Sequence, residues 1–375
     1  MFGKGLNSVS VFSNTYATTG ANSTVFGSVL SGGVATTGAH SAVSGDIVSV
    51  GATTTGGGGS SVGGSIINGG VATTGDGSII GGGVTSVGAA TIGANSRVGG
   101  NLVSAGVATT GDTSRVAGSV KSGGAASIGA NAVVGGLVEA VGAISVSASG
   151  KAGGTGSLSA APLTVGVRTD VLTESQQISE AQKTLKSMGA GTALATTMTT
   201  DMTLYAGVFS AANLSTTAGT TLTLDGQNKG NQSWVFNIED YLVTGASTRI
   251  VLINAGAGDS VVWNSGGYSS LGASSSFLGT ILARDYISVG ANTSVTGAGV
   301  SCGGVFSATS YVSTGDSAQI GGGGCLGIDN FTPPAGPGWP TLPSVPEPSS
   351  YLTLLTGLAF LGLLLRGKKR QPASA

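Results

Sequence analysis

The stretches AATIGANSRVGGNLVSAG (residues 89–106) and VATTGDTSRVAGSVKSGG (residues 107–124) follow one another in the chain and align without a gap. Apolar residues recur within each stretch at every second place, which is the period of a β-strand. Glycine occupies a fixed column, as at Gly93 and Gly111, where a coil must turn a corner with unusual backbone angles. An 18-residue unit divides into three short strands and three corners, so we predict an all-β fold, a three-sided β-solenoid (β-helix).

The same unit repeats along the whole N-terminal half, with one extra residue in the glycine run 56–59. Eight units start at Tyr16, Val34, Ala52, Val71, Ala89, Val107, Ala125 and Ala143. We expect two columns of apolar residues to stack inside the coils, namely Val43, Val62, Ile80, Val98 and Ile47, Ile66, Val84, Leu102. Residues 1–160 are therefore predicted to be a domain of β-helix repeats.

The composition narrows the classes of function. Of the 375 residues only 8% are charged and 5% aromatic, while 69 are glycine, so a conventional core of large side chains is not available. The net charge of -1 lacks the basic surplus of a nucleic-acid-binding protein, and we expect no such partner. The repeats contain no cluster of Asp, Lys, Arg or His, so we predict no catalytic residues, no metal site, no cofactor and no enzymatic activity.

A helix is predicted after the repeats, from Thr173 to Met188. Thr173 is a plausible N-cap with Gln176 three residues on, and Gly189 would end the helix. Four apolar residues keep helical spacing and would lie along one side of the solenoid; they are Ile178, Ala181, Leu185 and Met188. The strand period returns from Met202 onwards.

The second half contains six short blocks in a characteristic order and spacing. They are YAGVF (205–209), TLTLDG (221–226), WVFNI (234–238), TRIVLIN (248–254), DSVVWN (259–264) and SSFLGTILA (275–283). This half resembles the bacterial and fungal ice-binding (antifreeze) domain family over about 150 residues, which assigns residues 161–329 to such a domain. The resemblance implies a right-handed β-solenoid with one long α-helix packed alongside. The family has a few irregular coils before the helix where this chain has eight regular ones, so the repeats either extend that solenoid or form a second domain.

Ice binding, which the resemblance implies, needs a flat and rigid face of small hydroxyl and methyl groups. The third position of the repeat supplies a threonine column, Thr18, Thr36, Thr54, Thr73, Thr91 and Thr109, and the fourth position supplies Thr19, Thr37, Thr55, Thr74, Ile92 and Thr110. Neighbouring strand residues point to opposite sides, so only one of these columns faces out. Ile92 indicates that the fourth position points inward. We therefore predict the third-position threonines as the ice-binding residues, beside the Val or Ala of the first position.

Two alternatives to this face remain open. In the first alternative, the threonine column binds no ice; its side chains stack and hydrogen-bond to one another, and this only stabilises the coils. Some members of the family carry Thr-(Ala/Gly)-x-(Thr/Asn) on the ice face, a pattern that residues 19–22 and 110–113 fit. That pattern would require the fourth position to face outward.

The C-terminal segment has a distinct composition. Pro346, Glu347 and Pro348 precede an apolar run from Tyr351 to Leu365, and a basic cluster follows it. This order resembles the PEP-CTERM sorting signal over 346–375, which implies a hydrophobic helix that anchors the protein transiently in the membrane, an exosortase-type processing enzyme, and secretion or display on a bacterial cell surface. Residues 330–345 are rich in proline and are expected to be a stiff linker.

Two further expectations follow from export. Cys302 and Cys325 would form one disulfide in an oxidising compartment, with two buried free thiols as the alternative. An N-terminal export signal normally accompanies such a tail, but Met1 to Asn14 lacks the usual apolar core, so we expect the natural chain to begin further upstream.

The sequence thus predicts an extracellular or cell-surface protein that adsorbs to ice or ordered water through a flat face rich in Thr, Ser and Ala. The alternative is a surface adhesin or a structural protein of the exopolysaccharide matrix, with the same fold and a polysaccharide partner. A self-assembling scaffold resembling the bactofilins comes third, because a sorting signal does not suit a cytoplasmic filament.

Overall fold

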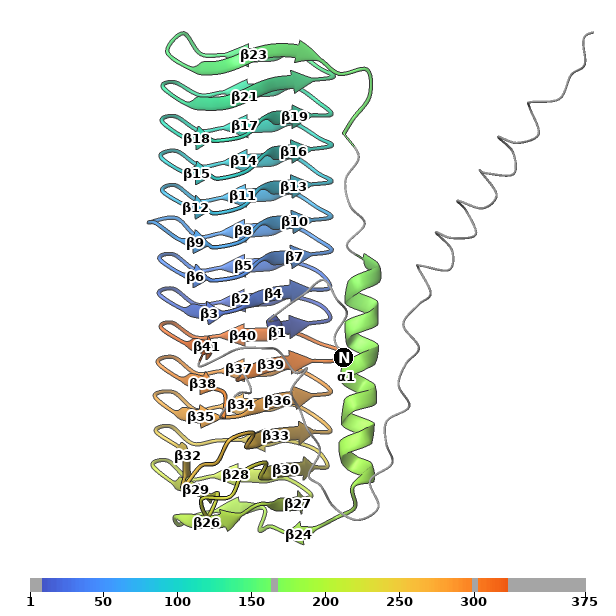
Figure 1. Cartoon of the computed structure of the whole chain (residues 1–375), viewed down its shortest axis with the longest axis vertical. Helices are drawn as coiled ribbons and strands as arrows, with labels where there is room; N and C mark the ends of the chain where they lie inside the picture. Colours follow the sequence, from blue (N-terminus) through green and yellow to red (C-terminus); the bar gives the residue numbers. More distant parts are fainter. Residues whose placement is uncertain (1–8, 163–167, 299–302, 323–375) are drawn as a thin grey trace, which may run out of the picture. The chain divides into compact units, whose positions relative to one another are not determined.

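Three-stranded coils build the molecule, as the 18-residue period predicts. The computed structural model describes residues 9–162, 168–298 and 303–322. A typical coil of the repeats contains β11 (Ala72–Thr74), β12 (Ile79–Ile80) and β13 (Val84–Ser86), separated by corners. Every strand pairs in parallel with the equivalent strands of the coils next to it, which makes a three-sided β-solenoid (Figure 1). The predicted fold class is confirmed.

The first face of the solenoid is a 14-stranded sheet. In spatial order its strands are β22 (Ile144–Val146), β20 (Ala126–Ile128), β17 (Ala108–Thr110), β14 (Ala90–Ile92), β11, β8 (Thr53–Thr55), β5 (Ala35–Thr37), β2 (Ala17–Thr19), β40 (Val312–Thr314), β37 (Ile287–Val289), β34 (Ser269–Leu271), β31 (Leu242–Val243), β28 (Leu214–Thr216) and β25 (Thr197–Met198).

The other two faces share a 27-stranded sheet, because β21 (Val133–Ala140) and β23 (Lys151–Ser157) extend across both. Below them the second face contains β18 (Arg115–Val116), β15 (Arg97–Val98), β12, β9 (Ser61–Val62), β6 (Ala42–Val43), β3 (Thr24–Phe26), β41 (Gln319–Gly321), β38 (Ser294–Thr296), β35 (Ser276–Leu278), β32 (Arg249–Ile253), β29 (Thr221–Asp225) and β26 (Met202–Tyr205). The third face contains β19 (Val120–Ser122), β16 (Leu102–Ser104), β13, β10 (Ile66–Asn68), β7 (Ile47–Ser49), β4 (Ser28–Ser31), β1 (Val9–Ser13), β39 (Gly304–Ser307), β36 (Thr280–Ala283), β33 (Ser260–Ser265), β30 (Ser233–Ile238), β27 (Gly207–Ala211) and β24 (Thr192–Ala193).

The repeats and the later coils form one continuous solenoid, a question that the sequence left open. The first coil of the repeats stacks on the last described coil of the chain, because β1 pairs with β39, β2 with β40 and β3 with β41. Figure 1 shows this junction where the blue coils meet the orange ones. The register places Ala17 beside Val312, so residues far apart in sequence continue a single ladder.

The helix α1 (Arg168–Ser187) lies against the third face, where it contacts β30, β33 and β39. Its predicted apolar stripe packs there: Ile178 and Leu185 are buried, and Ala181 and Met188 pack against the same cluster. The predicted start at Thr173 is wrong, since the helix already includes Arg168 and Thr173 lies inside it. No glycine or proline follows Gly166 until Gly189, so no residue type in this stretch stops the helix at Thr173.

The interior changes character along the solenoid. In the repeats it contains the predicted columns of Val, Ile and Leu, all of which are buried. In the later coils the largest buried side chains are aromatic, and Phe236 stacks on Trp263 with ring centroids 3.8 Å apart. His40 is an exposed corner residue with φ 56°, in the same column as Asn22 and Asn95, which have similar φ angles.

Candidate functional site

The outer surface of the 14-stranded sheet contains the predicted threonine column. Strand alternation directs the fourth position inward: Thr37, Thr74 and Ile92 are 5%, 2% and 1% exposed. The third position faces outward, and Thr18, Thr36, Thr54, Thr73, Thr91 and Thr109 are half-buried or exposed. This orientation agrees with the inference drawn from Ile92. The alternative pattern, which requires Thr19 and Thr110 to face outward, does not fit, because both side chains are buried.

The two threonine columns also differ in their hydrogen bonds. Inward threonines accept from the glycine amide of the next coil, as Thr74 Oγ1 does from Gly93 N at 3.0 Å. Thr314 Oγ1 accepts in the same way from Gly20 N at 3.2 Å, across the junction of the two halves. The six outward threonines make no side-chain hydrogen bond to the described residues. Stabilisation by hydrogen bonds along the stack therefore belongs to the inward column, and the outward hydroxyls remain available to water.

The outward column continues across the junction into the second half of the chain. Backbone register joins Thr18 to Ser313, and the row then runs down to Thr197. In order its members are Ser145, Ser127, Thr109, Thr91, Thr73, Thr54, Thr36, Thr18, Ser313, Ser288, Ser270, Val243, Ser215 and Thr197. All but Val243 carry a hydroxyl, so one hydroxyl row spans the whole sheet.

The neighbouring column, at the first position of the repeat, divides this surface into two zones. In the repeats it contains small apolar residues, namely Val34, Ala52, Val71, Ala89, Val107, Ala125 and Ala143. The first repeat and four coils of the second half instead carry a ladder of five stacked tyrosines, Tyr16, Tyr311, Tyr286, Tyr268 and Tyr241, with successive ring centroids 4.6, 5.0, 4.8 and 5.5 Å apart. Neither column contains a charged residue.

This tyrosine ladder was not predicted from the sequence. A signal was present, because Tyr16-Ala-Thr-Thr, Tyr286-Ile-Ser-Val and Tyr311-Val-Ser-Thr share one pattern of residue types. Desolvation by its surroundings raises the pKa of the Tyr16 hydroxyl, and Tyr311 adds to the shift. The same two causes raise the pKa of Tyr286, where Tyr268, Tyr311 and Asp285 contribute after desolvation.

Close packing at the corners keeps this face rigid. A Cβ atom added to Gly38 would lie 2.4 Å from the amide nitrogen of Ala21 in the neighbouring coil, so only glycine fits there. The repeats therefore stack at the spacing of a parallel sheet, about 4.8 Å, with outward residues about 6.6 Å apart along each strand.

The other predicted sites lie outside the described residues. They are the sorting motif Pro346, Glu347 and Pro348 and the cysteines Cys302 and Cys325, together with the linker and the C-terminal helix. Within residues 9–162, 168–298 and 303–322 no three potential metal ligands cluster. In the same part of the chain, no helix has the length and apolar character needed to cross a membrane.

Comparison with known proteins gives the family of this chain. The sequence model of the ice-binding-like family matches residues 101–313, which is more than half of the chain. The chain belongs to the ice-binding-like family. A second match, over residues 344–370, shows that this ice-binding-like chain carries a PEP-CTERM protein-sorting motif.

Individual relatives are similar over parts of the chain. Ice-binding protein 1 of Shewanella frigidimarina (strain NCIMB 400) is 33% identical over 98 residues, which cover 26% of this chain but only 11% of that relative. The solved ice-binding protein of the Antarctic ascomycete Antarctomyces psychrotrophicus is 24% identical, with a TM-score of 0.33 over 52% of this chain and 89% of that one. The solved DUF3494 domain of the Shewanella protein is 20% identical, with a TM-score of 0.36; the match covers 58% of this chain and 93% of that domain.

Proposed function

We propose that this protein binds ice through the outer surface of the 14-stranded sheet, in the zone formed by the repeats. The observation that carries the proposal is the outward row of Thr18, Thr36, Thr54, Thr73, Thr91 and Thr109, whose hydroxyls have no partner among the described residues. Their methyl groups lie beside these hydroxyls, as do the small apolar first-position residues next to all but Thr18, whose first-position neighbour is Tyr16. A surface of uncharged hydroxyl and methyl groups can order water through hydrogen bonds and apolar contacts, without charged groups.

Geometry supports a solid surface as the ligand. The hydroxyls repeat about every 4.8 Å along the solenoid, and rows of side chains lie about 6.6 Å apart along each strand, spacings of the order of the oxygen repeats in ice. A stack of parallel ladders holds these positions rigidly, whereas a flexible loop would not. The function proposed is adsorption, without a catalytic step. We do not favour the adhesin alternative, because the family match and the named relatives concern ice binding.

A single bulky side chain in the row tests the proposal. Thr73→Tyr should abolish most thermal hysteresis and inhibition of ice recrystallisation, because the ring would keep the flat surface away from the ice. The matched control is Thr24→Tyr, which makes the same change at an outward position of the second face, on β3. Full activity in Thr73→Tyr, with a wild-type protein that is active, would place the ice face elsewhere. The absence of activity in the wild-type protein would refute the proposal.

We also infer that the protein works outside the cell. The PEP-CTERM motif supports export, transient anchoring in the membrane and cleavage by an exosortase-type enzyme. Intact-mass measurement of the protein exported by its native host should show the loss of the segment after about Pro348. A full-length mass would support an uncut anchor instead.

A further inference from the structure

The few charges of the repeats have a pattern that ice binding does not explain. Residues 9–162 contain eight charged side chains: Asp46, Asp76, Arg97, Asp112, Arg115, Lys121, Glu139 and Lys151. The three aspartates cap corners, because an Oδ1 atom of each accepts a backbone N–H of the next coil. The donors are Ser65 at 2.6 Å, Ala94 at 2.8 Å and Ala130 at 2.7 Å.

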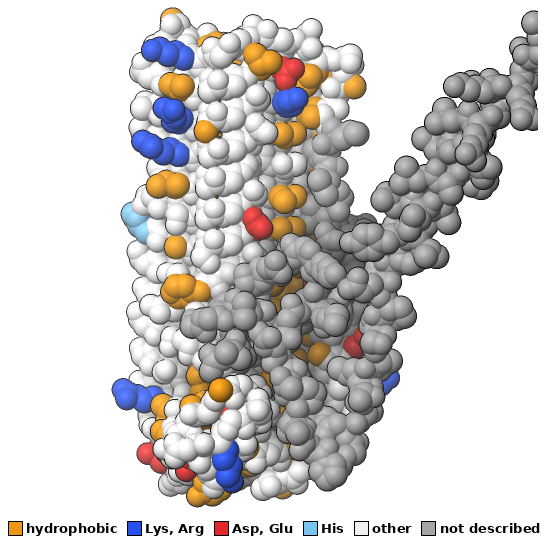
Figure 2. All heavy atoms as spheres, viewed as in Figure 1, with side chains coloured by type: hydrophobic (Ala, Val, Ile, Leu, Met, Phe, Trp, Pro, Cys, Tyr) orange, Lys and Arg blue, Asp and Glu red, His pale blue; other side chains and the backbone are white. Residues whose placement is uncertain are grey.

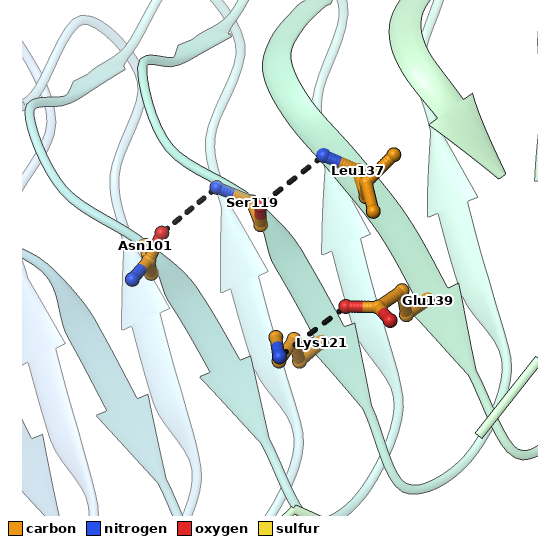
Figure 3. A network of polar contacts seen from close by, with 5 residues as sticks. All are labelled: Asn101, Ser119, Lys121, Leu137 and Glu139. Atoms are coloured by element: carbon orange, nitrogen blue, oxygen red, sulfur yellow. Dashed lines mark hydrogen bonds and ion pairs between the residues drawn. The ribbon is translucent and has the colours of Figure 1, made fainter. Parts of the chain in front are cut away.

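Two more charges satisfy each other on the third face. Lys121 Nζ lies 3.3 Å from Glu139 Oε2, beside a corner ladder in which Ser119 N donates to Asn101 Oδ1 (Figure 3). Ser119 Oγ in turn accepts from Leu137 N at 3.1 Å. These contacts account for five of the eight charges.

The three remaining charges are all cations, and they share one column. Arg97, Arg115 and Lys151 are exposed on β15, β18 and β23 of the second face, and none forms an ion pair within the described residues. Register places Arg97 beside Arg115, with Val133 between Arg115 and Lys151. Figure 2 shows basic side chains along this edge of the solenoid and few acidic ones near them.

A strip of small residues accompanies this basic column. The residues two places further along each strand or corner are exposed; they are Gly81, Gly99, Ala117, Gly135 and Gly153. At Gly99 an added Cβ would lie 2.1 Å from the carbonyl oxygen of Gly81, so this coil leaves no room for a side chain there. The cations therefore lie beside a row of exposed residues, each with a small side chain or none, that crosses several coils.

We propose that this column binds a linear polysaccharide that carries carboxylate groups. Arginine pairs with carboxylates through two parallel hydrogen bonds, and cations repeated at coil spacing suit a polymer with regularly placed anions. Ile79 and Val133 are the other neighbours in the column, so no aromatic side chain is placed there to stack on a nucleic-acid base. The column lies on a different face from the threonine row, so ice and polysaccharide can be bound at the same time.

Binding to a defined polyuronate tests this proposal. The purified full chain should bind immobilised polygalacturonate and not dextran, and added salt should weaken the binding because the contacts are exposed ion pairs. The double variant Arg97→Gln/Arg115→Gln should lose at least tenfold in affinity with an unchanged melting temperature. The matched control is Arg249→Gln on β32, which removes an exposed arginine of the same face and the same register row, but with the coils of Ser276, Ser294, Gln319, Thr24, Ala42, Ser61 and Ile79 between it and Arg97. It should keep wild-type affinity.

Three outcomes would overturn the proposal. Equal binding to dextran would show that charge is not recognised. An equal loss in Arg249→Gln would show that total charge matters rather than the column. Tighter binding to a single-stranded DNA oligonucleotide than to polygalacturonate would identify the column as a nucleic-acid site. Ice activity is measured separately, so neither result depends on the other.

Discussion

The two zones of the 14-stranded sheet share one backbone ladder and one hydroxyl row, yet their surfaces differ. From the second repeat onwards the row lies beside Val and Ala, whereas in the first repeat and in the coils of Tyr311, Tyr286, Tyr268 and Tyr241 it lies beside the tyrosine ladder. Their interiors differ in the same sense. The interior of the repeats contains small aliphatic side chains, whereas the longer coil that leads from Ser233 to its partner Ser260 contains Trp234, and the coil after it contains Trp263.

This difference shows what a regular face requires. A thin coil fills its centre with one Val, Ile or Leu from the strand of the second face, one from the strand of the third face, and small residues, mostly Ala and Thr, from the first face. Every coil can therefore have the same length and the same outward residues. Large aromatic side chains need wider coils, and wider coils need longer strands such as β30 and β33. The repeats are therefore the part of the solenoid in which the outer surface of the 14-stranded sheet can stay flat over many coils.

The largest effect is expected from the aromatic interior. Trp263 is 1% exposed and stacks on Phe236, and Trp263→Ala should lower the free energy of unfolding by about 3–5 kcal/mol. Chemical denaturation monitored by circular dichroism measures this change. Ile80→Val, in the thin coils, should cost only about 0.5–1.5 kcal/mol. Equal losses in both variants would mean that the two interiors do not differ in packing.

A charge placed inside the thin coils should be the next most damaging. Ile92 is 1% exposed, so Ile92→Lys should destabilise the protein by roughly 2 kcal/mol or more, because the ammonium group finds no partner there. Its neighbour Thr91 faces outward, and Thr91→Lys should change stability by no more than about 0.5 kcal/mol. Comparable melting temperatures for the two variants would contradict the assigned orientation.

Ice activity should separate the two zones of the face with little change in stability. Thr91→Lys should remove most thermal hysteresis, because the charge interrupts the flat zone. Ser288→Lys makes the same change in the same hydroxyl row, but beside Tyr286, and should leave activity largely intact. A greater loss in Ser288→Lys would move the ice face to the tyrosine zone.

The smallest effect concerns alkaline pH. The raised pKa values of Tyr16 and Tyr286 mean that the folded protein holds these phenol protons more tightly than the unfolded chain does. The stability that the two protons contribute is thus fully present below the ordinary phenol value of about 10, and it is lost as the pH rises through the folded-state values. Melting temperatures measured in this range should fall slightly less in Tyr16→Phe/Tyr286→Phe than in the wild type. An identical fall in melting temperature for the two proteins would show that ionisation of Tyr16 and Tyr286 does not affect stability.

Much of this protein was predictable from local patterns. The 18-residue period indicated three strands and three corners, Ile92 among threonines indicated the inward column, and the spacing of Ile178 and Leu185 indicated the buried side of α1. Each of these depends on residues within one or two coils, or within one helix. The start of the helix was misplaced because Thr173 has the chemistry of an N-cap but lies in a stretch that stays helical without one.

The tertiary structure alone decided which coils are neighbours. Every coil presents the same edge of backbone N–H and C=O groups, so the pattern of one coil does not specify its neighbour. Only the fold stacks β2 on β40, which brings Tyr16 onto Tyr311 and joins Thr18 to Ser313. The long hydroxyl row and the continuation of the tyrosine ladder into the first repeat follow from that one contact between the first and the last described coils of the chain. The repeat pattern does not fix a contact of such long range, because every coil shares that pattern; the first-position tyrosines mark Tyr16, Tyr286 and Tyr311 as similar without fixing which of them stack.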